Sequence, residues 1–249
     1  MSTLLNSLAP DLTNQIAVVT GASRGIGEAI ARALGACGAH TILAARSGER
    51  LEAVADEIRD AGGAATVAET DVADEKSIAQ LFETVDSIAK GRLDILINNA
   101  GVGSYGDVID ADLAGLDAMY AVNVRAPFLT CQQAMKRMAP VKSGTIINIG
   151  SVVGLKGYPR QGGYTSTKHA LVGMPKSLAS EAQEHGVRVS IICPGGVDTE
   201  LVTRARPDLD RSILMQPDDI ARTTLYLLAL PERAWVDSIY IRRATSSPW

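Results

Sequence analysis

The sequence is 249 residues long, and its 24 lysines and arginines against 28 aspartates and glutamates give a formal net charge of −4. A chain of this length can bury roughly 70–75% of its unfolded surface, in one domain or two small ones. The acidic excess argues against a nucleic-acid-binding protein, which usually carries a basic stripe. No apolar run reaches the ~18–20 residues of a membrane helix, and residues 1–15 do not resemble a signal peptide.

Cysteine and histidine give no sign of a disulfide framework or a metal site. The three cysteines, at positions 37, 131 and 193, are widely spaced and form no CxxC pair. The three histidines show no ligand spacing either. We therefore expect small buried thiols in a reducing cytoplasm, and no protein-bound metal.

Short apolar runs rich in β-branched residues alternate with segments of helical periodicity along the chain. The apolar runs predict strands over residues 16–20, 40–45, 65–68, 94–98, 144–150, 187–192 and 238–241. The periodic segments predict helices over residues 26–37, 51–60, 78–89, 113–138, 164–184 and 218–230. Residues 113–138 are expected to form one long helix.

The alternation predicts an α/β fold with a doubly wound (Rossmann) parallel sheet of about seven strands and helices on both faces. No linker or repeat divides the chain, so we expect a single domain over residues 1–249, with residues 1–14 as an N-terminal extension. Polar residues interrupt the pattern between Pro194 and Pro217. Such folds bind ligands at the carboxyl ends of the strands.

A glycine-rich turn follows the first strand, with glycines at positions 21, 25 and 27 before a helix begins. Glycine allows a sharp turn and a close approach of the backbone, and the helix N-terminus presents N–H groups to a phosphate. The pattern is weak by itself, and the strand before it and the helix after it make it specific. The turn predicts a dinucleotide site formed by Gly21, Ser23, Arg24, Gly25, Ile26 and Gly27. Ordinary turn glycines are the alternative.

The end of the second predicted strand indicates which dinucleotide binds. It reads Ala44-Ala45-Arg46, without the carboxylate that usually accepts from the ribose of NAD. A guanidinium at this place suits a 2′-phosphate, and Arg24 is expected to reach the same group. We therefore expect NADP(H) to be preferred over NAD(H). The alternative is that Arg46 is a solvated loop charge.

Five motifs in order resemble the short-chain dehydrogenase/reductase family, from about residue 16 to residue 241. They are the glycine turn, Asn98-Asn-Ala-Gly101, Ser151, Tyr164-Thr-Ser-Thr-Lys168 and Pro194-Gly-Gly.

Tyr164 and Lys168 lie four residues apart, on one face of a predicted helix. The ordinary pKa of a phenol is about 10, and a nearby ammonium lowers it by stabilising the phenolate. The resemblance implies that Tyr164 is the general acid and base, that Ser151 orients the substrate oxygen, and that Lys168 also holds the nicotinamide ribose. It further implies that Asn123 holds a water connecting the lysine to solvent.

The resemblance also implies further cofactor contacts. They are the adenine-binding pair Asp71 and Val72; Asn98, Ala100 and Gly101 along the middle of the cofactor; and Pro194, Gly195, Val197 and Thr199 at the nicotinamide end.

The sequence departs from the family pattern at three places. Pro175 falls inside the helix of Tyr164, where we expect a local kink beyond Lys168. Residues 200–216 correspond to the substrate lid and are few, which predicts an open pocket. The C-terminal residues 235–243 lack the usual glycine-rich ending, and Trp249 is expected to be disordered.

The leading hypothesis is an NADP(H)-dependent carbonyl reductase or alcohol dehydrogenase acting on a ketone, an aldehyde or a secondary alcohol. A 3-oxoacyl thioester reductase is the nearest alternative, with Arg204, Arg206 and Arg211 of the lid meeting the acyl carrier. A non-catalytic NADP(H) sensor or scaffold is a more distant one, and a sugar-nucleotide epimerase would need a larger C-terminal domain.

A homodimer or homotetramer is expected, because the helices over residues 113–138 and 164–184 carry apolar residues on more than one face. These residues are Met119, Phe128, Leu129, Leu171 and Leu178.

Overall fold

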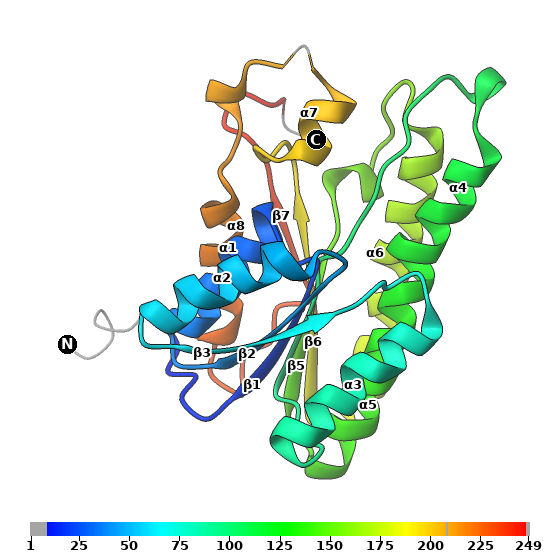
Figure 1. The fold of residues 1–249 in the computed structure, drawn as a ribbon. Helices are drawn as coiled ribbons and strands as arrows, with labels where there is room; N and C mark the ends of the chain where they lie inside the picture. Colours follow the sequence, from blue (N-terminus) through cyan, green and yellow to red (C-terminus); the bar gives the residue numbers. More distant parts are fainter. Residues whose placement is uncertain (1–8, 208, 248–249) are drawn as a thin grey trace, which may run out of the picture.

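The computed structural model describes residues 9–207 and 209–247 and contains one parallel sheet of seven strands (Figure 1). The strands are β1 (Ile16–Thr20), β2 (His40–Ala45), β3 (Ala64–Glu69), β4 (Ile95–Asn98), β5 (Gly144–Ile149), β6 (Val187–Pro194) and β7 (Ser238–Ile241). Their order across the sheet is β3-β2-β1-β4-β5-β6-β7, and every neighbouring pair is parallel. The predicted doubly wound fold is therefore confirmed. The N-terminal eight residues of the predicted extension, and Trp249, lie outside the described residues.

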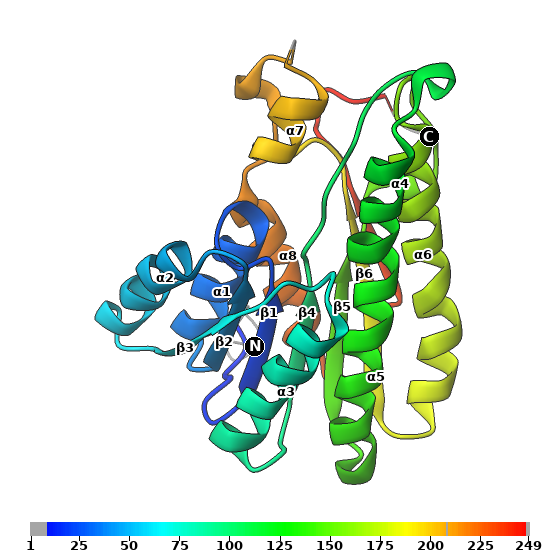
Figure 2. The same ribbon diagram turned by 45° about the vertical axis from the view of Figure 1, so that its right-hand side comes forward.

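Helices cover both faces of the sheet (Figures 1 and 2). One face is covered by α1 (Gly25–Ala36), α2 (Gly48–Asp60) and α8 (Pro217–Leu228). The other is covered by α3 (Glu75–Ala89), α4 (Leu113–Tyr120), α5 (Ala126–Met138) and α6 (Gly162–Gln183). The short helix α7 (Glu200–Ala205) lies above the carboxyl ends of the strands. Single turns complete the list: the π-helical turn η2 (Ala121–Arg125) and the 3₁₀ turns η1 (Val108–Asp110), η3 (Ala139–Val141), η4 (Val152–Gly154) and η5 (Arg211–Ile213).

The strands are apolar along their whole length because both faces are buried. Val18 packs among residues of the α3 and α5 layer, whereas its neighbour Val19 packs among those of the α1 and α8 layer. Both side chains are fully buried. Burial of one such side chain contributes about 1.5–3 kcal/mol relative to exposure, so the run of β-branched residues stabilises both layers at once.

The predicted single helix over residues 113–138 is divided. The π-helical turn η2 separates α4 from α5, with the amide of Ala126 bonded to the carbonyl of Ala121 five residues earlier. Pro127 explains the irregularity, because it has no N–H to donate to the carbonyl of Asn123. By contrast, α6 continues through Pro175, and the kink expected at this proline stays a prediction.

Strand β1 marks the point at which the strand order reverses. It pairs with β2 on one side and with β4 on the other, so the chain leaves the ends of β1 and β4 in opposite directions. This divergence opens a crevice at the carboxyl edge of the sheet, where folds of this type bind ligands.

The apolar surface expected to mediate oligomerisation is only partly exposed. Met119 and Leu171 are buried within the chain itself, because they pack in the interior clusters around Tyr164 and Ile191. Phe128 is exposed on α5. In the described part of the chain, no helix is long and apolar enough to cross a membrane.

Candidate active site

A cavity of about 1010 Å³ occupies the crevice at the carboxyl ends of the strands. Residues far apart in sequence line it: the glycine turn, the loops after β2, β3, β4, β5 and β6, helix α7, and the segment after β7. The cavity thus extends along the edge of the sheet from the glycine turn toward β6 and β7.

The glycine turn is held by its backbone conformation and by the loop after β4. Gly21 and Gly25 have φ values of +66° and +59°, which favour glycine. A Cβ atom on Gly27 would lie 2.3 Å from the carbonyl oxygen of Gly21. The side-chain amide of Asn99 donates to the carbonyls of Thr20 (3.0 Å) and Gly21 (3.2 Å). The helix and the turn therefore meet at a spacing that only glycine permits.

Arginines gather at the end of the cavity near β2. Arg46 follows β2, and Arg24 and Arg50 line the same cavity. Arg24 pairs with Glu200 of α7, and the guanidinium of Arg50 lies 3.9 Å from the same carboxylate. Glu200, in the segment expected to be the substrate lid, thereby contacts Arg24, one of the two arginines expected to meet a 2′-phosphate.

Tyr164, Lys168 and Ser151 come together in the cavity. Tyr164 and Lys168 are buried, and the Nζ atom of Lys168 lies 5.8 Å from the centroid of the Tyr164 ring. Lys168 donates to the carbonyl of Ile149, the last residue of β5 (3.2 Å). Ser151 follows two residues later, and its hydroxyl accepts from the amide of Val153 (3.1 Å). The end of β5 therefore positions both the serine and the lysine.

Burial controls the acidity of these groups. It raises the pKa of Tyr164 well above its ordinary value, and nearby Tyr105 raises it further, while the hydrogen bond with Ser151 lowers it. Burial lowers the pKa of Lys168 to about 8. The direction of the Tyr164 pKa shift is therefore set by burial, and the lowering expected from Lys168 is not seen.

Asn123 lies behind the residues that line the cavity, and both its side-chain oxygen and its side-chain nitrogen are hydrogen-bonded within the chain. It accepts from the amide of Val102 (2.9 Å) and donates to the carbonyl of Val102 (2.9 Å) and to Thr167 Oγ1 (3.1 Å). Its main-chain carbonyl has no amide four residues later, since that residue is Pro127. The side chain of Asn123 thus connects the loop after β4 to α6, and its role in holding a water stays a prediction.

Contrary to expectation, Asn98 does not line the cavity. Its side chain points into the interior, where its Oδ1 accepts from Thr130 Oγ1 (2.6 Å) and its amide donates to Asn148 Oδ1 (3.0 Å). At the end of a buried strand, these side chains satisfy one another because water does not reach them. Asn98 thus supports the following loop.

Most of the predicted residues line the cavity. They are Gly21, Ser23, Arg24, Gly25, Ile26, Arg46, Asp71, Val72, Ala100, Gly101, Ser151, Tyr164, Lys168, Pro194, Gly195, Val197 and Thr199. Three predicted residues do not line the cavity and lie behind the residues that do: Gly27, Asn98 and Asn123.

Three residues are notable among those of the cavity that sequence reasoning missed. Tyr105 packs edge-on against Tyr164 with ring centroids 5.7 Å apart, and burial raises its pKa to about 12. The side-chain amide of Asn99 donates to the glycine turn, and the sequence indicated this residue only as part of the motif Asn98-Asn-Ala-Gly101. Arg243 follows the last strand, in a segment without any recognisable pattern.

Comparisons with known proteins agree with this geometry. The profile of the short chain dehydrogenase family matches residues 15–210. The 3-oxoacyl-[acyl-carrier-protein] reductase of Aquifex aeolicus (strain VF5) is 34% identical over 225 residues, covering 87% of this chain and 90% of the relative.

Two solved structures are also similar. A metagenomic short-chain oxidoreductase in complex with NADP has a TM-score of 0.83 and 38% identity, covering 95% of this chain and 100% of that chain. An alcohol dehydrogenase from the archaeon Thermococcus sibiricus, complexed with 5-hydroxy-NADP, has a TM-score of 0.87 and 31% identity, covering 94% of this chain and 99% of that chain. With its profile match, its sheet order and its cavity, the chain belongs to the short-chain dehydrogenase family of oxidoreductases.

Proposed function

We propose that this chain is an NADP(H)-dependent carbonyl reductase that also runs in reverse as an alcohol dehydrogenase. The observation that carries the proposal is the meeting of Ser151, Tyr164 and Lys168 in one cavity that begins at a phosphate-binding turn. A dinucleotide bound there would supply or accept the hydride. Two related proteins of known structure are described as complexes with NADP or a derivative of it.

The proposed proton donor is the phenol of Tyr164. Its hydroxyl would donate to the substrate oxygen during reduction and take the proton back during oxidation. Ser151 would donate a second hydrogen bond to the same oxygen. Lys168, whose pKa is lowered to about 8, would favour the phenolate when it is charged and would hold the nicotinamide ribose. The carbonyl of Asn123 would hold a water near the lysine.

Replacing Tyr164 by Phe tests this assignment. We expect kcat to fall by about 10²- to 10⁴-fold while NADPH binding, measured by fluorescence, stays within about two-fold. A variant that retains turnover would refute the assigned acid. A wild-type protein that binds NADPH but reduces no ketone, aldehyde or thioester would instead favour the sensor or scaffold hypothesis.

The preference for NADP(H) rests on Arg24, Arg46 and Arg50 at one end of the cavity. Hydrogen bonds to a charged phosphate predict that kcat/KM with NADPH exceeds that with NADH by about 10- to 100-fold. Replacing Arg46 by Met should reduce this ratio through the KM of NADPH. A wild-type preference for NADH would contradict the proposal.

A 3-oxoacyl thioester reductase is the second candidate, because the Aquifex aeolicus relative carries that name. Two of the lid arginines that would meet an acyl carrier also have partners in the chain: Arg211 donates to Asp198 (2.8 Å), and Arg204 lies 3.8 Å from Glu200. Neutralising Arg204, Arg206 and Arg211 together should raise KM for an acyl thioester and leave simple ketones unchanged. Equal effects on both substrates would exclude this candidate.

We further propose that residues 200–216 form the substrate lid of a single-domain enzyme and that the enzyme is a cytoplasmic homo-oligomer. The free thiols of Cys37, Cys131 and Cys193 are consistent with a reducing compartment. Light scattering would test assembly, and a clean monomer would contradict it.

A further inference from the structure

The cavity is strongly cationic although the chain is acidic overall. Among the described residues, eight arginines and two lysines line it, against three carboxylates. All three carboxylates are engaged: Asp71 accepts from the amide of Ala73, Asp198 from Arg211, and Glu200 pairs with Arg24. The positive charge is therefore not balanced within the cavity, and an anionic ligand is favoured there.

Four of these arginines lie at two different ends of the cavity. Arg24, Arg46 and Arg50 lie where the cofactor phosphate is proposed to bind. Arg243 belongs to the segment that follows β7, at the end where β6 and β7 lie side by side (Figure 1). The cofactor phosphates account for the first three and leave Arg243 without an assigned partner.

The sheet register fixes the position of Arg243. Ile241 pairs with Pro194, and the amide of Gly195 donates to the carbonyl of Ile241 (2.8 Å). Two residues later, the Cδ atom of Arg243 lies 3.3 Å from the place where a Cβ atom on Gly196 would be. The side chain therefore packs on the glycine pair that follows β6, at the proposed nicotinamide end of the cavity.

The guanidinium of Arg243 has a hydrogen-bond partner at one nitrogen and lacks one at another. Its Nε donates to Ser246 Oγ (3.1 Å), whereas its Nη1 is buried and has no hydrogen-bond partner. In the described part of the chain, the only other buried side-chain nitrogen or oxygen in this condition is Thr165 Oγ1. A buried N–H of a permanently charged group is costly to leave unpaired, and a planar carboxylate matches the guanidinium best.

The wall around Tyr164 has the opposite character. Tyr105, Met119, Val153 and Leu201 pack together with Tyr164 and also line the cavity. A substrate whose carbonyl meets Tyr164 would thus have an apolar wall on one side and a guanidinium in the same cavity.

We propose that Arg243 binds a carboxylate on the substrate, so that the preferred substrates are oxo acids in reduction and hydroxy acids in oxidation. This inference rests on the proposed reductase activity and names its substrate class. It assigns Arg243 as the residue that determines specificity.

The test compares each anionic acid with its neutral methyl ester. The probes are 3-oxobutanoate and 4-oxopentanoate, each against its methyl ester, with NADPH in excess. For the wild type, we expect at least one acid to exceed its ester by about ten-fold in kcat/KM. Arg243→Met should lower kcat/KM for that acid by about 10- to 100-fold, mainly through KM, and leave the ester within about two-fold.

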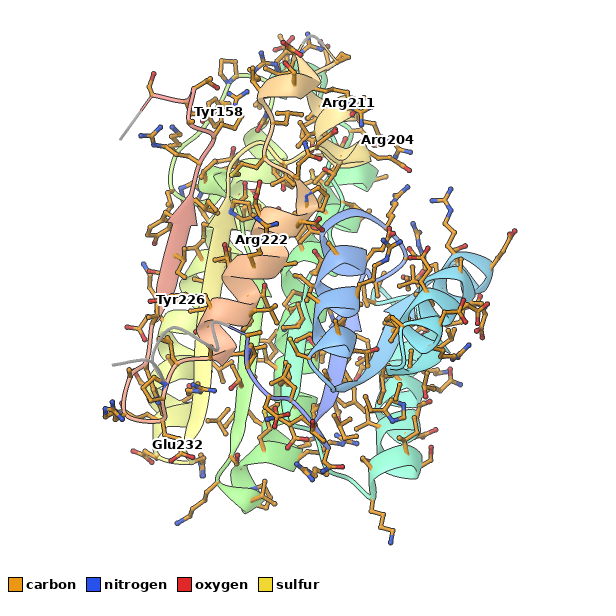
Figure 3. All side chains as sticks on the ribbon, turned by 90° about the vertical axis from the view of Figure 1, so that its left-hand side faces the viewer. Tyr158, Arg204, Arg211, Arg222, Tyr226 and Glu232 are labelled. Carbon is orange, nitrogen blue, oxygen red and sulfur yellow. The ribbon has the colours of Figure 1, made fainter. Side chains whose placement is uncertain are left out.

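Two further variants control the comparison. Arg243→Lys keeps the charge but loses the planar fork, so its acid-to-ester ratio should fall between those of the wild type and Arg243→Met. Arg222 is an exposed arginine on α8, and Figure 3 shows it below Arg204 and Arg211 of the lid. Because Arg222 does not line the cavity, Arg222→Met should retain the wild-type ratio.

The outcomes separate this inference from the proposed function. If the wild type reduces esters and neutral ketones without preferring either acid, or if Arg243→Met slows acid and ester equally, the inference is overturned and the reductase activity stands. If the wild type reduces neither series and no other ketone, aldehyde or thioester, the proposed function fails, and thermal unfolding of the NADPH-loaded protein then tests the carboxylate site. Stabilisation by 3-oxobutanoate that Arg243→Met abolishes would then support the carboxylate site, and no stabilisation of the wild type would overturn it.

Discussion

Thr130 provides a quantitative test of the buried hydrogen bonds behind the cavity. Its hydroxyl donates to Asn98 Oδ1 (2.6 Å) and to the carbonyl of Ala126, four residues earlier (3.0 Å). Thr130 and Asn98 are only 1% and 4% exposed. Thr130→Val keeps the shape of the side chain and removes the donor, so the oxygen of Asn98 loses a partner that water cannot easily replace. The expected loss in the free energy of unfolding is about 1–3 kcal/mol.

Thr84 in α3 supplies the matched control. Its hydroxyl makes the same bond to the residue four earlier, Gln80 (3.1 Å), but in an exposed setting. Thr84→Val therefore carries the same change in helix propensity, and its expected cost is within about 0.5 kcal/mol. Urea unfolding followed by circular dichroism, at one protein concentration, would measure both variants. A Thr130→Val variant within about 0.5 kcal/mol of Thr84→Val would refute the assigned role of the buried bond.

Three other perturbations test separate parts of the site. Gly27→Ala should lower stability by about 1–3 kcal/mol and weaken NADPH binding, because its Cβ would lie 2.3 Å from a backbone oxygen. Gly106→Ala is the control and should do neither, because no atom lies within 4 Å of the added carbon. Equal stabilities of the two variants would contradict the packing argument. The folded-state pKa of Lys168 is lowered from 10.5 to about 8, so between these values the unfolded chain binds a proton there that the folded chain does not. The stability of the wild type relative to Lys168→Met should therefore rise with pH across this window in denaturant titrations, and a falling difference would oppose the assignment. Glu200→Gln removes the carboxylate that holds Arg24 and should tighten NADPH binding, but not NADH binding, by roughly two- to five-fold in fluorescence titrations; weaker NADPH binding would argue against competition for that arginine.

Local patterns predicted the elements well because each strand is apolar on both faces and each helix has one apolar stripe. The first, second and last strands begin and end at the predicted residues. The sixth strand continues two residues further, through Cys193 and Pro194, because it also pairs with β7. The spacing of Tyr164 and Lys168 placed both on one helix, and the resemblance supplied Ser151 as their neighbour.

Features that depend on distant partners could not be read from local patterns. Arg24 and Glu200 are 176 residues apart and meet only because α7 lies over the glycine turn. The inward direction of Asn98 depends on Thr130 and Asn148, which come from another helix and another strand. The break in the long helix was readable, since Pro127 within an apolar periodic segment removes a backbone donor.

The pairing of β1 with β4 has a consequence for folding. The amide of Ile16 is bonded to the carboxylate of Asp94, 78 residues later (2.7 Å), whereas β1 and β2 are close in sequence. Closing a loop of that length costs entropy before any contact rewards it, so we expect the β1–β4 seam to form late and to limit the folding rate. A dinucleotide bound across the seam would hold together the two halves that join last and would slow their separation. The lifetime of the folded chain would then follow the supply of its cofactor.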